Sequence, residues 1–305
     1  MFEKLGLHHQ SIANLPTVKG KIKRNEPMSH HTRFGVGGPA DIYFEPETEK
    51  DLALFLQYIN MPITILGAGS NVLIRDGGLI GAVVHLPKDF GGLSRQGDRI
   101  MCGAGVLNAD LARFALQNEL SGFEFLAGIP GTIGGALRMN AGAYGFEMKD
   151  IVESVRVMDA KGAIQEITTD ETFLSYRNNA MPDDWIFLSA VLKGTPKKAD
   201  DIANKMAELK QLRESRQPVW AKTCGSTFKN VRDVPAWKLI EKAGCRGLKR
   251  GGALVSEKHC NFLINDNHAT AEDLEELGCE VQKRVLDTCG IQLEWEVKRL
   301  GQKKQ

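Results

Sequence analysis

The sequence lacks any apolar segment long enough to form a membrane-spanning helix. No stretch approaches 18 uninterrupted apolar residues, and residues 1–23 contain no apolar core of a signal peptide. An excess of charge is missing as well, because 39 basic residues against 38 acidic ones leave a net charge of +1. We therefore expect no membrane insertion and no general electrostatic attraction to nucleic acids.

Cysteine is sparse, and its spacing points to no metal or disulfide framework. The six cysteines of this 305-residue chain include no CxxC pair, and the seven histidines form no H-E-x-x-H motif. Scattered cysteines in a chain of this length are typical of reduced residues in a core or pocket. We expect a cytoplasmic protein without a metal site, in which Cys224 is a buried and inert thiol.

The length and the distribution of glycine suggest two domains with different roles. A chain of this size corresponds to about two domains of roughly 150 residues. Twenty-two of the 32 glycines precede residue 150, and such enrichment indicates tight turns or a backbone that approaches a ligand closely. We expect an N-terminal segment over 1–27, a cofactor domain over 28–200 with a break near 87–100, and a smaller α/β domain over 201–305.

The hydrophobic pattern predicts a mixed α+β fold. Apolar residues at helical spacing and helix-capping signals predict helices over 48–59, 108–117, 199–216, 235–242 and 270–290. Alternating or short apolar runs predict strands over 40–44, 63–66, 72–74, 81–86, 100–102, 152–159, 163–168, 185–192, 262–264 and 293–297. Asn108 is the predicted cap of the second helix, and Thr270 with Asp273 forms a capping box for the last one.

Two glycine-rich turns are the strongest candidates for cofactor binding. Residues 67–71 (GAGSN) follow a predicted strand, so their backbone N–H groups are suited to a pyrophosphate. They do not match the dinucleotide fingerprint, because Val72 stands at the position of its third glycine, and no Gly-Lys-Ser/Thr of a P-loop follows. Alone, such a turn more often has a structural role. A second run over 128–135 favours a large dinucleotide such as FAD.

Three polar residues are candidates for chemistry, although each also has a plain structural interpretation. Arg177 is either a solvated surface group or a fixed cation for a carboxylate or phosphate. Ser226 lies in a short polar segment that is either a turn or a source of a proton. It does not form a nucleophile elbow, because Phe228 stands where the G-x-S-x-G motif has its last glycine. Glu296 is either a solvated carboxylate on a strand or part of the same site.

Taken together, the motifs resemble those of the UDP-N-acetylenolpyruvoylglucosamine reductase family. The resemblance extends over roughly residues 28 to 300, and eight motifs occur in the same order and spacing. It is closest to the shorter class of the family, because the chain has no room after Arg177 for the inserted tyrosine loop of the other class. The matching segments are 32–40, 66–71, 128–135 with 140–145, 175–177, 216–218, 225–230, 251–259 and 293–297.

The resemblance implies a vanillyl-alcohol-oxidase-type FAD domain and a small C-terminal α/β domain that binds substrate. NADPH would reduce the flavin, which would then reduce UDP-N-acetylglucosamine enolpyruvate to UDP-N-acetylmuramate for peptidoglycan synthesis. Arg177 and Glu296 would stabilise the charge that develops on the substrate carboxylate, and Ser226 would donate the proton. Ser70 stands where related folds attach flavin to a histidine, so we expect noncovalent FAD.

The resemblance also implies binding residues, with some departures from the family pattern. His259 stands where the other class has glutamine, Trp295 where the family often has proline, and Asn179 where serine is common. The implied substrate-binding residues are Tyr176, Arg216, Lys229, Asn230 and His259. The implied FAD-binding residues are Leu66, Gly67, Ala68, Gly69, Ser70, Asn71, Gly128, Ile129, Pro130, Gly131, Gly134, Gly135, Asn140, Ala141 and Gly142.

Two other functions remain as alternatives at this point. One is a flavin oxidoreductase of the same fold that acts on an alcohol or a lactone. Ser226, Arg177 and Glu296 argue against it, because such oxidations need a base rather than groups that stabilise an enolate. The other is a noncatalytic module that binds a sugar nucleotide or flavin. No obligate protein partner is evident from the sequence.

Overall fold

The structure is a computed structural model that describes residues 17–170, 173–232 and 234–304. The described residues form two compact units, each assembled from separate stretches of the chain. The first comprises 17–24, 42–68 and 81–211, and the second comprises 25–41, 69–80 and 212–304. The short helix expected before Pro16 lies outside the described residues. The domain bounds expected from the sequence stay a prediction.

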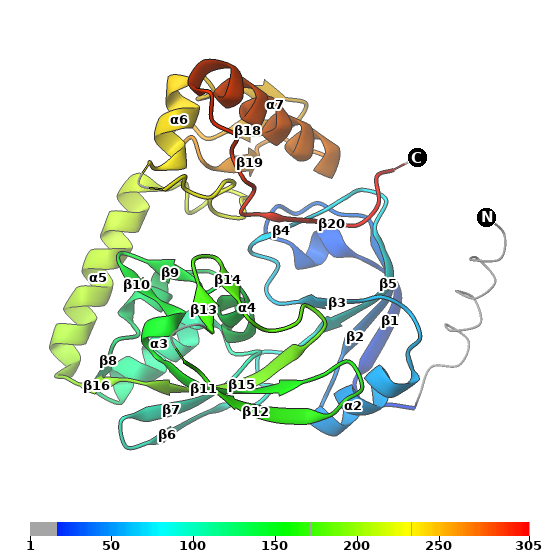
Figure 1. Ribbon diagram of the computed structural model, residues 1–305, viewed down its shortest axis with the longest axis vertical. Coiled ribbons are helices and arrows are strands. Elements are labelled where there is room, and N and C mark those ends of the chain that lie inside the picture. Colours follow the sequence, from blue (N-terminus) through cyan, green and yellow to red (C-terminus); the bar gives the residue numbers. More distant parts are fainter. Residues whose placement is uncertain (1–16, 171–172, 233, 305) are drawn as a thin grey trace. The chain divides into compact units, whose positions relative to one another are not determined.

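A five-stranded antiparallel sheet is the centre of the first unit (Figure 1), with the strand order β12-β11-β15-β7-β6. The predicted hairpin over 152–159 and 163–168 is confirmed, because β11 and β12 pair directly in antiparallel register. The five strands of this sheet are β6 (Leu93–Gln96), β7 (Arg99–Gly103), β11 (Val152–Met158), β12 (Ile164–Thr168) and β15 (Ile186–Lys193).

A second sheet has the order β1-β2-β5-β3, and its strands β3 and β5 run parallel. Its strands are β1 (Lys21–Pro27), β2 (Pro39–Glu45), β3 (Ile63–Leu66) and β5 (Leu79–His85). The predicted helix over 48–59 is α2 (Glu49–Tyr58), and the side chain of Thr48 caps it by accepting a hydrogen bond from the Asp51 N–H. Strand β1 was not predicted, because its residues are mostly exposed and charged and show no apolar alternation.

Helices and short strands complete the first unit, and their apolar sides join one continuous core with the sheets. Within that core, the rings of Phe44 and Phe55 stack at 4.1 Å and attach α2 to β2. The helices are α3 (Asn108–Gln117), α4 (Ile133–Arg138), α5 (Ala199–Arg216), η2 (Glu124–Gly128) and η3 (Met148–Asp150). The short strands are β8 (Leu120–Ser121), β9 (Gly142–Ala143), β10 (Phe146–Glu147), β13 (Leu174–Ser175), β14 (Asn178–Asn179) and β16 (Thr195–Pro196).

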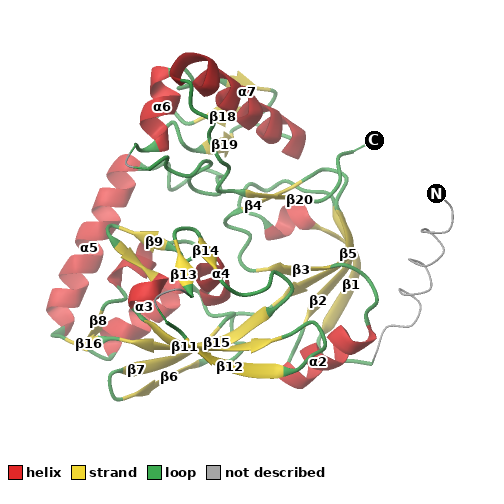
Figure 2. Ribbon diagram, in the orientation of Figure 1, coloured by secondary structure: helices red, strands yellow, loops and turns green. Residues whose placement is uncertain are grey.

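The second unit has its own core, and one side of the long helix α7 (Ala271–Cys289) contributes to it. Figure 2 shows this helix. The predicted limits of this helix are confirmed by the Thr270–Asp273 capping box and by Gly290, which ends the helix with a φ of 67°. The other elements of the second unit are η1 (Met28–His31), α6 (Ala236–Lys242), β17 (Lys249–Arg250), β18 (Ala253–Val255), β19 (Leu263–Asn265), β4 (Val72–Ile74) and β20 (Lys298–Leu300).

The end of the chain differs from the prediction. Residues 293–297 are not a regular strand: only Trp295 forms a bridge, with Phe228, and the last strand is β20, which pairs in parallel with β4. The reason is that the Glu296 and Val297 N–H groups both donate to the Thr227 carbonyl, at 2.8 and 3.3 Å, which interrupts the alternation of a strand. The apolar spacing instead reflects burial of Leu293 and Val297 in the core.

Asn108 is not the cap of α3, contrary to the prediction. Leu107 occupies the cap position, without a side-chain hydrogen bond, and Asn108 is the first helical residue. Its side chain is fully buried, where Nδ2 donates to the carbonyl of Ile129 at 3.2 Å. The residue therefore contacts a glycine-rich turn instead of its own helix.

Across the part of the chain that the structure describes, no helix is both long and apolar enough to cross a bilayer. Within the same residues, no group of three or more His, Cys, Asp or Glu side chains is arranged to hold a metal ion. All six cysteines are free thiols. Cys224 is buried, as predicted, and burial raises the pKa of its thiol to about 12.

Candidate functional site

The two glycine-rich turns adjoin each other within the first unit. A Cβ atom on Gly67 would lie 2.7 Å from Oγ1 of Thr132, so only glycine permits this approach. Thr132 is the N-cap of α4, and its Oγ1 accepts a hydrogen bond from the Gly135 N–H at 3.3 Å. The expected turns over 66–68 and 128–135 thus border one another. The remaining residues of the first turn, 69–71, belong to the second unit.

Asn108 supports the second of these turns and carries an unused polar atom. Its backbone N–H donates to the Gly131 carbonyl at 3.0 Å, in addition to the side-chain bond to Ile129. Its Oδ1 is buried and has no hydrogen-bond partner among the described residues. A buried acceptor without a partner is costly. This acceptor beside a glycine-rich turn therefore fits a bound group with hydrogen-bond donors, such as FAD.

Asn140 connects the segment after α4 to the neighbouring hairpin. The side chain is buried, and its Nδ2 donates to Glu147 Oε2 at 3.0 Å and to the Ser175 carbonyl at 3.1 Å. Its Oδ1 accepts a hydrogen bond from the Lys149 N–H at 3.0 Å. The protein itself thus engages both ends of this amide. A role of residues 140–142 in FAD binding stays a prediction.

Arg177 lies at the tip of a tight hairpin in the first unit. Strands β13 and β14 pair so that Tyr176 and Arg177 form the two-residue turn, and Arg177 has a φ of 55°. Its guanidinium donates to the Asn140 carbonyl at 3.5 Å and lies 5.1 Å from the centre of the Tyr176 ring. These contacts give the cation a defined place on the surface of the unit.

Asn179 stands at a position where the family commonly has serine. Its side chain holds the base of this hairpin. Its Nδ2 donates to the Arg138 carbonyl at 2.6 Å, and its Oδ1 accepts from the Met181 N–H at 2.9 Å. Arg138 in turn donates to the carbonyls of Pro182, at 3.0 Å, and Trp185, at 2.5 Å. The end of α4 therefore holds both sides of the segment that carries Arg177.

Ser226 and Glu296, which are 70 positions apart in the sequence, are neighbours in the second unit. Residues 227–229 run antiparallel to residues 294–297, with Phe228 opposite Trp295. The Glu296 N–H donates to the carbonyl of Thr227 at 2.8 Å, which places it beside the residue that follows Ser226. Both Ser226 and Glu296 are half-buried. The backbone segments that carry Ser226 and Glu296 are thus adjacent.

Asn261 holds this loop, although no sequence motif indicates such a role. Its side chain accepts a hydrogen bond from the Phe228 N–H at 3.0 Å and donates to the Phe228 carbonyl at 2.8 Å. Its own carbonyl accepts from the Thr227 N–H at 2.8 Å. The only possible signal was a polar residue within an otherwise apolar run, and that signal does not identify a partner.

The predicted substrate-binding residues have different environments. Asn230 accepts a hydrogen bond from the Ala236 N–H at 3.0 Å, and Lys229 pairs with Glu294 at 2.5 Å. His259 is half-buried against Phe262, and burial lowers the pKa of its imidazole. Its Nδ1 is buried and without a hydrogen-bond partner among the described residues. Arg216 and Tyr176 are exposed to solvent.

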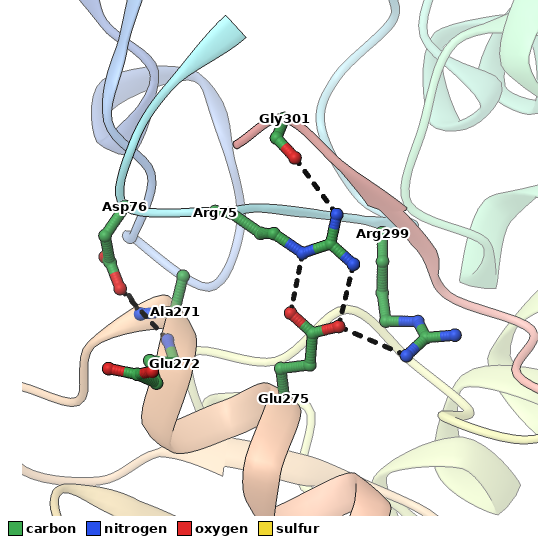
Figure 3. Close-up of polar contacts among 7 residues, drawn as sticks. All are labelled: Arg75, Asp76, Ala271, Glu272, Glu275, Arg299 and Gly301. Atoms are coloured by element: carbon green, nitrogen blue, oxygen red, sulfur yellow. Dashed lines mark hydrogen bonds and ion pairs between the residues drawn. The ribbon is translucent and has the colours of Figure 1, made fainter. Parts of the chain in front are cut away.

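A buried carboxylate joins three elements of the second unit (Figure 3). Glu275 of α7 accepts hydrogen bonds from Arg75 Nε and Nη2, at 2.7 and 2.8 Å, and from Arg299 Nη1 at 3.2 Å. Asp76 accepts from the Ala271 and Glu272 N–H groups, both at 3.0 Å, at the start of α7. Because Arg75 follows β4 and Arg299 lies in β20, these contacts fasten both strands to the helix.

This network predicts a stability that depends on pH. The hydrogen bond from Arg75 is the main reason why the pKa of Glu275 lies below its ordinary value of 4.5. A carboxyl whose pKa is lower in the folded state stabilises the fold above the unfolded-state pKa, and this contribution is lost as the pH falls. We expect Glu275→Gln to lower the free energy of unfolding by about 2 kcal/mol at pH 7, between the values for exposed and buried pairs.

Urea unfolding of the wild type and Glu275→Gln between pH 3 and 7 tests this expectation. The difference between the two proteins should shrink as the pH falls below about 4.5. A difference that stays constant over this range would show that the charge of Glu275 does not stabilise the fold. Glu272→Gln, at an exposed position of the same helix, is the control.

Comparison with known proteins places these observations in one family. Residues 40–168 match the model of an FAD binding domain. Residues 217–300 match the model of the C-terminal domain of UDP-N-acetylenolpyruvoylglucosamine reductase. A protein of that name from Paramagnetospirillum magneticum is 51% identical over 289 residues, which cover 94% of each chain. The chain belongs to the UDP-N-acetylenolpyruvoylglucosamine reductase family.

Further members of the family agree with this assignment. The UDP-N-acetylenolpyruvoylglucosamine reductase of Gluconobacter oxydans is 46% identical over 94% of this chain and 95% of its own. The enzyme of this name from Thermus caldophilus has a crystal structure and is 32% identical in sequence. That structure matches with a TM-score of 0.81 and covers 93% of this chain and 100% of the Thermus chain. The expected family and the expected FAD-binding domain followed by the family's C-terminal domain are confirmed.

Membership makes the protein a flavin-dependent oxidoreductase of peptidoglycan precursor synthesis. The buried Asn108 Oδ1 is the feature of this chain that fits its FAD. The alternative of a noncatalytic module, left open by the sequence, is thereby excluded. The roles of individual residues are not decided by membership.

Proposed function

We propose that this reductase transfers a hydride from NADPH, through FAD, to UDP-N-acetylglucosamine enolpyruvate, and so forms UDP-N-acetylmuramate. The observation that carries the proposal is the pairing of residues 227–229 with 294–297, which makes Ser226 and Glu296 neighbours. A proton donor and a carboxyl group carried by adjacent segments suit the reduction of an enolpyruvyl carboxylate. An alcohol oxidase would need a base instead.

FAD, when bound, would accept hydride from NADPH and deliver it to the methylene carbon of the substrate. The residues of this chain that would hold it are the two turns over 66–71 and 128–135, together with residues 140–142. Their backbone N–H groups suit the pyrophosphate. Asn108, which supports the second turn, adds a buried acceptor for a donor of the cofactor.

Arg177 and Glu296 would stabilise the charge that develops on the substrate carboxylate during hydride transfer. The guanidinium provides a permanent positive charge with several donors. Glu296 supports the same charge only when it carries a proton, since an ionised carboxylate would repel it.

Ser226 would complete the reaction by donating the proton of its hydroxyl to the carbon next to the carboxylate. Tyr176, Arg216, Lys229, Asn230 and His259 would bind the nucleotide sugar. Both reactants are water-soluble nucleotides, which accords with the expected cytoplasmic location.

Steady-state turnover tests this function directly. Without oxygen, purified protein with FAD should oxidise more than one equivalent of NADPH only when UDP-N-acetylglucosamine enolpyruvate is present, and the product should be heavier than the substrate by two hydrogens. In deuterated water, the product should carry one deuterium on the carbon that Ser226 protonates. Turnover with an alcohol or lactone, and none with the enolpyruvyl substrate, would overturn the proposal. Parallel reactions with NADH measure the preference for NADPH.

A further inference from the structure

A glycine in the middle of α7 has an unusual role. Gly278 is buried at the centre of this 19-residue helix, where glycine disfavours helical structure relative to alanine. A Cβ atom at this position would overlap the indole ring of Trp295. The missing side chain thus leaves a notch in the helix surface, and the ring of Trp295 occupies it.

Trp295 is held in this notch from several sides. Its Nε1 donates a hydrogen bond to Oε1 of Gln282, one turn further along α7, at 2.8 Å. Its ring lies 5.0 Å from that of Phe228 and 4.5 Å from the guanidinium of Arg299. Arg299 is itself bound to Glu275 of the same helix (Figure 3). The ring therefore has one defined position on α7.

The residues next to Trp295 are the proposed catalytic ones. Trp295 pairs with Phe228, two residues after Ser226, and it immediately precedes Glu296. The backbone of Glu296 is held by the Thr227 carbonyl at 2.8 Å and by Asn71 Nδ2, which donates to its carbonyl at 3.1 Å. A shift of the indole ring would therefore move the backbone that carries Glu296 and the loop that carries Ser226.

We propose that Trp295, seated in the notch at Gly278, is a positioning residue that fixes Glu296 against the Ser226 loop for protonation and charge stabilisation of the substrate. The inference rests on the proposed function. Its physical basis is the sensitivity of catalysis to geometry, since a displacement of about 1 Å can slow a reaction about 100-fold. The pair also explains how the chain accommodates tryptophan at a position where proline is common.

A double-mutant cycle under anaerobic conditions tests the proposal, with rates normalised to bound flavin. Gly278→Ala and Trp295→Ala should each slow reoxidation of the reduced flavin by the enolpyruvyl substrate at least about tenfold. Reduction of the flavin by NADPH should change less than about twofold. The double variant should be no slower than Trp295→Ala alone, because the added methyl group then meets no ring.

The control for the helix is Cys279→Ala, at the adjacent exposed position, which should leave both half-reactions unchanged. Trp295→Leu also removes the ring and its bond to Gln282 but keeps an apolar side chain, and it replaces the alanine variant in the cycle if that protein does not fold. Equal slowing of both half-reactions, or independent effects of the two substitutions, would overturn the positioning role.

Thermal unfolding separates this inference from the proposed function. Gly278→Ala should lower the Tm of the wild type by several degrees and that of Trp295→Ala by less than about 1 °C. If the wild type is not reoxidised by the substrate, the proposed function fails, and the positioning role fails with it. The Tm values of the wild type, the two single variants and the double variant still show whether Trp295 packs against Gly278. If the substrate reoxidises the wild type and Gly278→Ala equally well, the positioning role alone fails.

Discussion

Replacing Ser226 with alanine is expected to slow reoxidation of the reduced flavin by UDP-N-acetylglucosamine enolpyruvate about 100-fold or more, because the proton donor is lost. Reduction of the flavin by NADPH should continue at the wild-type rate, since that step requires no proton from this side chain. Anaerobic stopped-flow absorbance at the flavin band measures the two steps separately.

The control for this prediction is Ser215→Ala, near the end of α5. The hydroxyl of Ser215 donates to the nearby Leu212 carbonyl, at 2.9 Å, and both half-reactions should be unchanged without it. Equal slowing of reduction and reoxidation in Ser226→Ala would contradict the role as a proton donor. It would indicate instead that the loop over 225–230 has lost its structure.

Replacing Glu296 is expected to separate the charge of this residue from its capacity to donate a hydrogen bond. Glu296→Ala removes both and should slow reoxidation by a factor of about 100 to 1,000, as for the loss of other groups that stabilise a transition state. Glu296→Gln keeps a neutral donor of nearly the same shape, so its rate should exceed that of the alanine variant by at least about tenfold. Single-turnover kinetics of both variants measure the difference.

The outcome also reports the protonation state of Glu296. If glutamine and alanine are equally slow, the residue acts as an ionised carboxylate, and the proposed stabilisation by a protonated group is wrong. Glu272→Gln, on the exposed surface of α7, is the matched control and should retain wild-type rates.

Local signals in the sequence predicted most of the regular elements. The helix over 270–290 was predictable because its capping box and final glycine are determined by a few adjacent residues. The hairpin of β11 and β12 was predictable for a similar reason, since a short turn separates two alternating strands. Such elements depend little on distant parts of the chain.

The elements that the sequence did not predict depend on distant contacts. Residues 293–297 alternate like a strand, but the carbonyl of Thr227, about 70 residues earlier, accepts two of their N–H groups and breaks the regular pairing. Asn108 resembles a helix cap, but its partner is the carbonyl of Ile129. A single sequence contains no information on such pairings beyond the residue types.

The candidate site shows the same limit. The residue types of Arg177, Ser226 and Glu296 became meaningful through the family resemblance, since each one alone has an ordinary structural interpretation. The supporting residues Asn261 and Gly278 were not predictable, because their roles are defined by Phe228 and Trp295 from other segments. The catalytic residues of the site are therefore predictable through the family resemblance, but the residues that hold them in place are not.

One anaerobic measurement tests the central claim most directly. The purified protein is reconstituted with FAD, reduced with one equivalent of NADPH, and then mixed with UDP-N-acetylglucosamine enolpyruvate. We expect the flavin absorbance to disappear with NADPH and to return fully with the enolpyruvyl substrate. A flavin that NADPH bleaches but that this substrate leaves reduced would contradict the proposed reaction.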